Sequence, residues 1–159
     1  METTLQIMSY ANPKERAKLK PILKRWFQNP KDLHLTEPRM TYPFRFQKWV
    51  QLSLLESPSR TYLLVKNKYV LAHLSCGYDH ERCRGTLFHL FVDPHYRRQG
   101  YAKKIMKAAE LETQQEGMKT LQLRLLPQNV KAGNLLERLG YSVKKKTRGG
   151  LLIMFKVLA

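Results

Sequence analysis

The clearest signal for ligand chemistry in the sequence is a basic segment with a single glycine, Val92–Ala102, which joins an apolar strand to a helix. A glycine at such a turn lets backbone N–H groups approach a phosphate, and the dipole of the following helix favours negative charge. The basic residues in and just after the segment are Arg97, Arg98, Lys103, Lys104 and Lys107. The segment has neither the Gly-Lys-Ser/Thr of a P-loop nor the three spaced glycines of a dinucleotide fingerprint. It is therefore either an anion-binding loop of another kind or a surface turn.

A second signal is His89, a titratable side chain in the apolar run 86–92. A histidine, with an ordinary pKa of about 6.5, suits the removal of a proton from an ammonium group. Regular strand alternation places His89 on the face of Leu87 and Phe91 and opposite Phe88, so only one of the two sets faces a cleft unless a bulge intervenes. His89 is therefore either a general base or a core histidine bonded to backbone.

Cys76 and Cys83 flank a polar stretch, 79–84, that contains Asp79, His80 and Glu81. Zinc sites usually show closer ligand pairs and four well-spaced ligands, which this stretch does not supply. We therefore predict no metal site and expect both cysteines to be reduced thiols, as in a cytoplasmic protein.

The elements that must position these residues begin with a helical front end, residues 1–58. A helix is expected over 12–27, kinked or restarted at Pro21, and a second helix over 44–55. The stretch 29–43 reads as a loop with at most a short helical turn. Some aromatic side chains here either line an acceptor pocket or only pack the helices: Trp26, Phe27, Tyr42, Phe44, Phe46 and Trp49.

After residue 60 the pattern changes to short apolar runs alternating with amphipathic helices. Strands are expected at 61–65, 69–76, 86–92, 121–126 and 151–157, and helices at 101–117 and 129–139. Asn67-Lys68 is the expected turn of a hairpin. This order predicts a single α/β (α+β) domain, residues 1–159, with a mixed sheet.

The composition bounds the class of protein. The 159 residues include 29 Lys+Arg and 12 Asp+Glu, a formal charge of +17, and 43% are hydrophobic, which fits a folded domain rather than a disordered basic tail. No apolar run approaches the ~18 residues of a membrane helix, and we expect no export signal and a cytoplasmic location. The charge either attracts a polyanion such as RNA or the ribosome, or serves only solubility. A monomer and a homodimer are both open.

Three segments resemble motifs of the GNAT superfamily of N-acetyltransferases. Residues 97–102, Arg-Arg-Gln-Gly-Tyr-Ala, are similar to its Arg/Gln-x-x-Gly-x-Gly/Ala pyrophosphate loop, and 129–132 to its Asn-x-x-Ala. Residues 135–141, Leu-Leu-Glu-Arg-Leu-Gly-Tyr, are similar to its Leu-Tyr-Glu-Lys-Leu-Gly-Phe segment. The sequence of the strand segment 86–94 is similar to that of the ribosomal-protein alanine acetyltransferase type. The resemblance implies a largely antiparallel sheet with helices on both faces.

The same resemblance implies an acetyl-CoA site in the core 86–141, between two diverging strands, with residues 1–58 on the acceptor side. Pantetheine is then expected on the backbone of Leu90, Phe91 and Val92, and Asn129 at the pantetheine arm. The pyrophosphate is expected beside Arg97 and on the amides of Arg98, Gln99, Gly100, Tyr101, Ala102 and Lys103. Transfer of an acetyl group to a primary amine follows: that of a small molecule, a peptide or protein N-terminus, or an aminoacyl-RNA.

Two positions depart from the family pattern. The tyrosine that often acts as general acid is Leu136, and the glutamate base of the ribosomal-protein type is Arg124. Leucine has no proton to donate and a guanidinium is not a base. Either positioning of the substrates and proton transfer by solvent suffice, or other side chains transfer the protons. His89 is then the first candidate. Further candidates, with no order among them, are Tyr141, Tyr101, Glu56 and Asp79. The alternative is a module that binds CoA, RNA or the ribosome with little catalysis.

Overall fold

The computed structural model describes residues 2–158. The strands are β1 (Thr4–Met8), β2 (Ser59–Lys66), β3 (Tyr69–Asp79), β4 (Arg84–Val92), β5 (Thr120–Leu125), β6 (Ser142–Lys146) and β7 (Leu152–Val157). The helices are α1 (Pro13–Trp26), α2 (Pro30–Thr36), α3 (Phe46–Leu54), α4 (Tyr101–Gln115) and α5 (Val130–Arg138), with a short 3-10 turn at Pro94–Tyr96.

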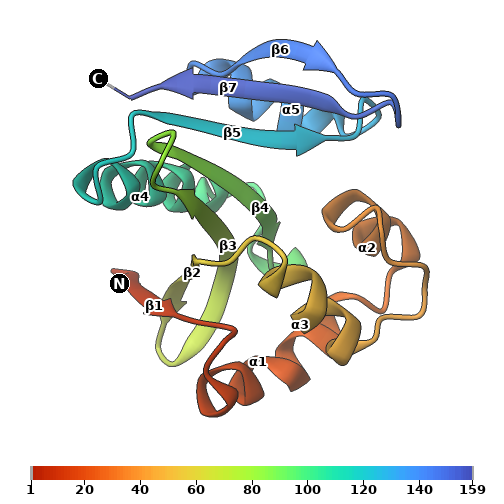
Figure 1. Ribbon diagram of the computed structural model, residues 1–159. Coiled ribbons are helices and arrows are strands. Elements are labelled where there is room, and N and C mark those ends of the chain that lie inside the picture. Colours follow the sequence, from red (N-terminus) through yellow and green to blue (C-terminus); the bar gives the residue numbers. More distant parts are fainter. Residues whose placement is uncertain (1, 159) are drawn as a thin grey trace.

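The strands form one seven-stranded sheet in the order β1-β2-β3-β4-β5-β7-β6. Neighbouring strands are antiparallel except β4 and β5, which are parallel. The β4–β5 pairing covers only Arg84–Thr86 against Thr120–Gln122, after which the strands diverge (Figure 1). The central strand therefore keeps a partner on one side only beyond Thr86.

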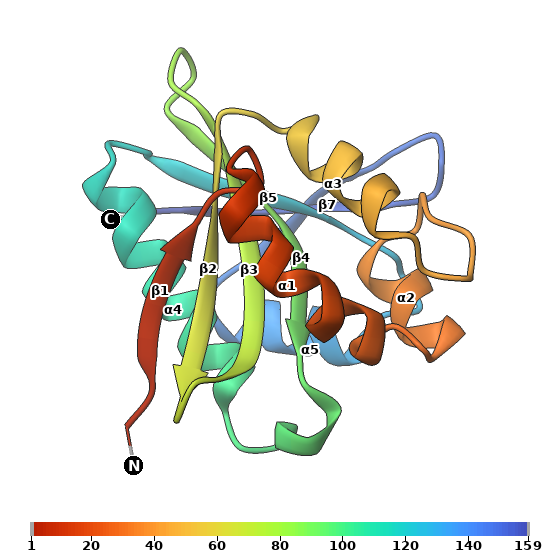
Figure 2. The ribbon, with the colours of Figure 1, turned by 90° about the horizontal axis from the view of Figure 1, so that it is seen from below.

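Helices cover both faces of the sheet, and each face has its own apolar core (Figures 1 and 2). On one face α4 and α5 bury residues such as Ile105 and Leu136 against Leu74 and Leu121. On the other face the three N-terminal helices pack against the sheet around Trp49. The predicted fold class, a mixed and largely antiparallel sheet between helices, is confirmed.

The hairpin of β2 and β3 confirms the predicted turn, since Asn67 and Lys68 both adopt positive φ angles of 50° and 69°. Asn12 caps α1 as expected: its side-chain oxygen accepts two backbone N–H groups. Of the two effects expected at Pro21, a restart of the helix is wrong, because α1 continues through this residue, and a kink stays a prediction. Proline is tolerated best in the first turn of a helix and destabilises its interior. Here the packing of the buried α1 side chains Leu19, Leu23 and Trp26 outweighs that cost.

The sequence patterns missed three elements. The stretch predicted as loop holds the seven-residue helix α2, capped by Asn29 in the same way as α1. Strands β1 and β6 were not predicted either. β6 is exposed along its whole length, so it lacks the apolar alternation by which strands are recognised in a sequence. Its place is decided by pairing with β7.

Candidate functional site

The divergence of β4 and β5 opens the centre of the sheet. Leu87–Val92 bonds to β3 on one side, whereas its edge toward β5 has no strand partner among the described residues. Such an edge presents backbone N–H and C=O groups that an extended ligand can pair with. Leu90, Phe91 and Val92, expected at pantetheine, all lie in this stretch.

A β-bulge at His89 changes which side chains face which side. His89 has a φ of 56°, and the β3 register shifts between His73, opposite Phe91, and Ser75, opposite Phe88. Leu87 consequently packs in the core beneath α4, whereas Phe91 packs in the core of the N-terminal helices. The prediction that Leu87, His89 and Phe91 share a face is therefore wrong, because the extra residue interrupts the alternation.

The loop after β4 is built to expose backbone amides. Asp93 anchors its start: its N–H donates to the Leu71 carbonyl, and its carboxylate accepts the Trp26 indole N–H at 2.9 Å. Arg98 and Gly100 then adopt positive φ angles of 65° and 83°, and α4 begins at Tyr101. A Cβ on Gly100 would meet nothing within 4 Å, so its surroundings are open. The turn is thus a concave nest of amides at a helix N-terminus.

The loop's side chains divide in two groups. The Arg97 guanidinium turns toward α2: it donates to the Val92 carbonyl, lies 3.4 Å from the Asp32 carboxylate and sits over the Phe91 ring. The side chains of Gln99 and Lys103 are exposed together with Arg98, whereas Tyr101 and Ala102 are half-buried. Asn129, at the N-terminus of α5, makes no capping bond with its side chain.

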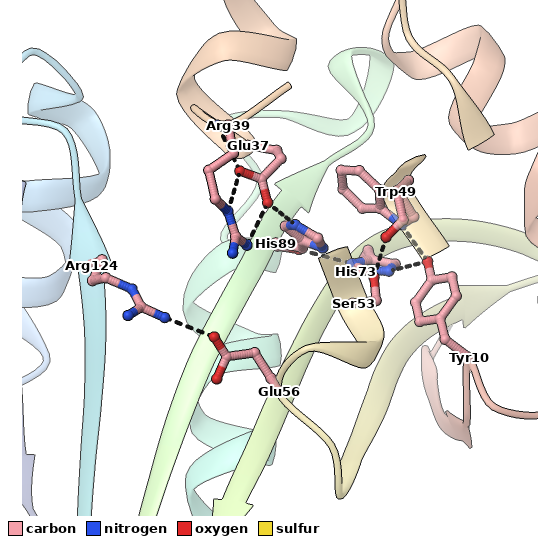
Figure 3. Close-up of polar contacts among 9 residues, drawn as sticks. All are labelled: Tyr10, Glu37, Arg39, Trp49, Ser53, Glu56, His73, His89 and Arg124. Atoms are coloured by element: carbon pink, nitrogen blue, oxygen red, sulfur yellow. Dashed lines mark hydrogen bonds and ion pairs between the residues drawn. The ribbon is translucent and has the colours of Figure 1, made fainter. Parts of the chain in front are cut away.

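A cleft of about 260 Å³ lies across the divergence, on the side of the N-terminal helices. It is lined by Thr36, Glu37, Pro38, Arg39, Glu56, Leu87, Phe88, His89, Arg124 and Leu151. Both diverging strands contribute side chains, and so do the segments before and after α3. The cleft therefore brings two carboxylates, two guanidinium groups and one imidazole to the open centre of the sheet (Figure 3).

Glu37 and His89 form a buried pair in this cleft. The His89 Nε2 lies 2.9 Å from the Glu37 Oε1, and their side chains are 1% and 2% exposed. Burial opposes ionisation of Glu37, but hydrogen bonds from His89 and Arg39 outweigh it and lower its pKa to about 2. Burial lowers the pKa of His89, more than Glu37 raises it. At neutral pH the pair is thus a carboxylate and a neutral imidazole.

This pairing assigns the imidazole tautomer. A carboxylate only accepts, so the proton of His89 resides on Nε2 and leaves a lone pair on Nδ1. Nδ1 is buried and has no hydrogen-bond partner among the described residues. Arg39 holds Glu37 from the other side through two side-chain bonds of 2.8 and 3.1 Å. The arrangement orients a basic nitrogen and supports the charge that it acquires on protonation.

A chain of buried hydrogen bonds holds the bulge in place. The Trp49 indole N–H donates to the Tyr10 hydroxyl, which donates to the His73 Nε2 at 2.8 Å. The opposite nitrogen of His73 donates to the His89 carbonyl, also at 2.8 Å. Burial lowers the pKa of His73 to about 3, so it remains neutral. The Trp49 ring additionally stacks on the His89 ring at 3.8 Å between centroids.

The two departures from the family pattern have different structural outcomes. Leu136 is fully buried in the core under α5, where its position supplies packing only. Arg124 faces the cleft and binds Glu56, with 2.7 Å between guanidinium nitrogen and carboxylate oxygen. Glu56, which follows α3, thus brings a carboxylate to the cleft next to Arg124. Gly77 permits this, because a Cβ there would lie 2.6 Å from the Glu56 carbonyl.

The remaining sequence candidates lie in other contacts. The Tyr141 hydroxyl donates to Glu110, and Asp79 pairs with Arg82. Most of the front-end aromatic residues pack in the core rather than line the cleft. Cys76 and Cys83 are free thiols, and within residues 2–158 no group of three or more His, Cys, Asp or Glu side chains could hold a metal.

Sequence patterns did not point to Glu37 and Arg39, which lie in a stretch read as loop. Thr36-Glu37-Pro38 has no periodicity, and only the fold brings Glu37 to a residue 52 positions away.

None of the described helices is both long and apolar enough to cross a membrane.

Residues 19–141 match the acetyltransferase (GNAT) family. Among curated proteins, the chain is 40% identical over 57 residues to the ribosomal protein bS18-alanine N-acetyltransferase of Haemophilus ducreyi. That match covers 36% of this chain and only 39% of the relative's length. This chain is also 27% identical over 154 residues to N-alpha-acetyltransferase 30 of Saccharomyces cerevisiae, a match that covers 92% of this chain and 80% of that protein.

Solved structures show the same fold. The ribosomal-protein-S18-alanine N-acetyltransferase of Escherichia coli superposes with a TM-score of 0.71 at 19% identity, over 99% of this chain and 95% of that one. The spermidine N-acetyltransferase of Vibrio cholerae in complex with CoA and spermine superposes with a TM-score of 0.77 at 11% identity, over 98% and 95% of the two chains.

Proposed function

Because the chain belongs to the acetyltransferase (GNAT) family, whose members use acetyl-CoA, we propose that it acetylates a primary α-amine of a peptide or protein in the cleft between β4 and β5. The observation that carries this is the buried Glu37–His89 pair at the open centre of the sheet. The two curated relatives, by their names, are a protein-alanine and an Nα-acetyltransferase, which favours an α-amine over a polyamine.

The residues present fit acetyl-CoA. The free edge of Leu87–Val92 suits the amide groups of pantetheine, and the open nest from Arg98 to Lys103 suits the pyrophosphate. Asn129, without a capping bond of its own, is available to the pantetheine arm. When bound, acetyl-CoA supplies the acetyl group as a reactive thioester.

His89 is the proposed general base. The acceptor enters as an ammonium and must lose a proton before its nitrogen attacks the thioester carbonyl carbon. His89 Nδ1, buried next to the cleft and without a hydrogen-bond partner among the described residues, takes the proton once the bound acceptor or a water molecule reaches it, and Glu37 supports the imidazolium through Nε2. The new N–C bond forms as the C–S bond breaks, and the nitrogen releases its second proton to solvent. The thiolate of CoA takes a proton from solvent, since Leu136 cannot donate one. Glu56 is placed to attract the incoming ammonium.

The test compares acetyl transfer by wild type and His89→Gln. Gln retains an N–H donor for Glu37 but has no basic nitrogen. Thiol release from acetyl-CoA and the mass of the acetylated peptide are measured against pH. We expect kcat to fall by about 10²-fold or more, with KM for acetyl-CoA unchanged and the acidic limb of the pH profile lost. His34→Gln, the same change at an exposed position of α2, serves as control.

The cosubstrate site has its own test. Gly100→Glu is expected to weaken CoA binding in calorimetry by at least about tenfold, because the carboxylate enters the phosphate nest. Gly117→Glu is the matched control, since Gly117 also has a positive φ and open surroundings but lies at the far end of α4.

Unchanged turnover in His89→Gln would refute the assignment of His89 as general base. CoA binding without acetylation of any peptide or small amine would favour a binding module.

A further inference from the structure

A groove of about 550 Å³ lies in the helical layer, between α1 and the start of α3. Figure 2 shows these two helices on the same face of the sheet. The residues that line the groove are Lys20, Lys24, Phe44, Arg45, Phe46, Gln47, Lys48 and Gln51. It shares no residue with the cleft that holds Glu37 and His89.

All charged side chains that line the groove are positive. Lys20 and Lys24 lie one helical turn apart on α1, and Arg45 and Lys48 come from the opposite wall. Within residues 2–158 the structure shows no ion pair for any of these four, whereas Arg25 on the same helix pairs with Asp93 at 3.1 Å. Four unpaired cations in one concavity repel each other and attract an anionic ligand.

Aromatic rings lie between these cations. Phe44 and Phe46 are half-buried in the groove, and the Lys20 Nζ is 6.0 Å from the centre of the Phe46 ring. A basic concavity with aromatic side chains is the arrangement by which proteins hold single-stranded nucleic acids: the cations meet phosphates, and bases stack on the rings. A membrane surface instead requires apolar side chains that protrude.

We propose that this groove binds single-stranded nucleic acid. The consequence for acetyl transfer rests on the proposed function: an acceptor attached to the same nucleic acid is presented to the cleft. α3 lines the groove as far as Gln51 and ends two residues before Glu56 of the cleft, so four residues of the chain separate the two sites along this segment. The groove thus anchors the acceptor's carrier, and the cleft acetylates its amine.

The experiment measures binding of labelled RNA and DNA oligonucleotides of about 12 nucleotides by fluorescence anisotropy over a range of salt concentrations. Lys20→Ala/Lys24→Ala is expected to weaken binding at least about tenfold and to reduce the slope of log K against log salt by about 1.4, for two lost phosphate contacts. Phe46→Leu is expected to weaken binding about fivefold or more with an unchanged slope. The control with equal charge change is Lys145→Ala/Lys146→Ala on exposed β6.

Acetylation of a short free peptide is measured with the same variants, and we expect it to be unchanged in Lys20→Ala/Lys24→Ala. Loss of nucleic-acid binding with intact peptide acetylation supports the groove, whatever the acceptor proves to be. Equal weakening by the β6 control would overturn the proposal, because binding would then follow net charge alone. Tighter binding to phosphatidylserine vesicles or polyglutamate than to either oligonucleotide would also overturn it.

Discussion

The Glu37 carboxylate is expected to be a large and pH-dependent contributor to stability, and Glu37→Gln tests this. The side chain is only 2% exposed and accepts bonds from His89, from the Arg39 guanidinium and from the Arg39 backbone N–H. Gln keeps the size but loses the charge, and its amide nitrogen would face a donor. The variant therefore removes charge-assisted bonds from a buried site.

The magnitude follows from the pKa. Partner bonds outweigh burial and lower the pKa of Glu37 from 4.5 to about 2, which corresponds to ~3 kcal/mol of unfolding free energy at pH 7. Because the folded pKa is the depressed one, this contribution is complete above pH 4.5 and is lost as the pH falls toward 2. At pH 3 about 1 kcal/mol is expected to remain.

Urea unfolding of wild type and Glu37→Gln at pH 7 and pH 3 measures both values. The difference between the two proteins should shrink from ~3 to ~1 kcal/mol between these pH values. Glu81→Gln, an exposed position in the β3–β4 turn, should stay within about 0.5 kcal/mol of wild type at both. A Glu37→Gln cost that is the same at pH 7 and pH 3 would refute the reasoning.

Three further predictions concern the surroundings of the cleft. Gly77→Ala places a Cβ 2.6 Å from the Glu56 carbonyl, so we expect ~1–3 kcal/mol of destabilisation in thermal unfolding and a lower kcat. Leu136→Tyr, which restores the family residue, should not raise kcat and should destabilise by ~1–3 kcal/mol, because the leucine is fully buried. Tyr10→Phe leaves the His73 Nε2 and an indole N–H without partners, which should cost ~2–4 kcal/mol in urea unfolding while CoA affinity is retained.

The turn that precedes α4 was predictable because its features are local. The loop from Arg97 to Ala102 exposes amides through a positive φ at Gly100 and the start of one helix, and all of these are properties of consecutive residues. The alternation of apolar residues similarly predicted the central strands and the two C-terminal helices. Where pairing alone decides a strand, as in exposed β6, the sequence carried no signal.

The acceptor side was not predictable, because its residues meet only through long-range packing. His89 is a candidate from the sequence, but regular alternation groups it with both Leu87 and Phe91, which the bulge separates onto different faces, since a period-two pattern does not show one extra residue in a strand. No pattern in the sequence points to its partner Glu37.

The sequence alone thus determined a basic α/β domain with a glycine-containing turn between its central strand and the following helix, through periodicity, glycine conformation and charge. The tertiary structure alone decided the divergence of β4 from β5, the bulge at His89 and the carboxylates that face it. These depend on hydrogen bonds between residues 16 and 52 positions apart, from His73 to the His89 carbonyl and from the His89 imidazole to Glu37. No local pattern encodes them, because each bond is defined only when the two cores have brought the segments together.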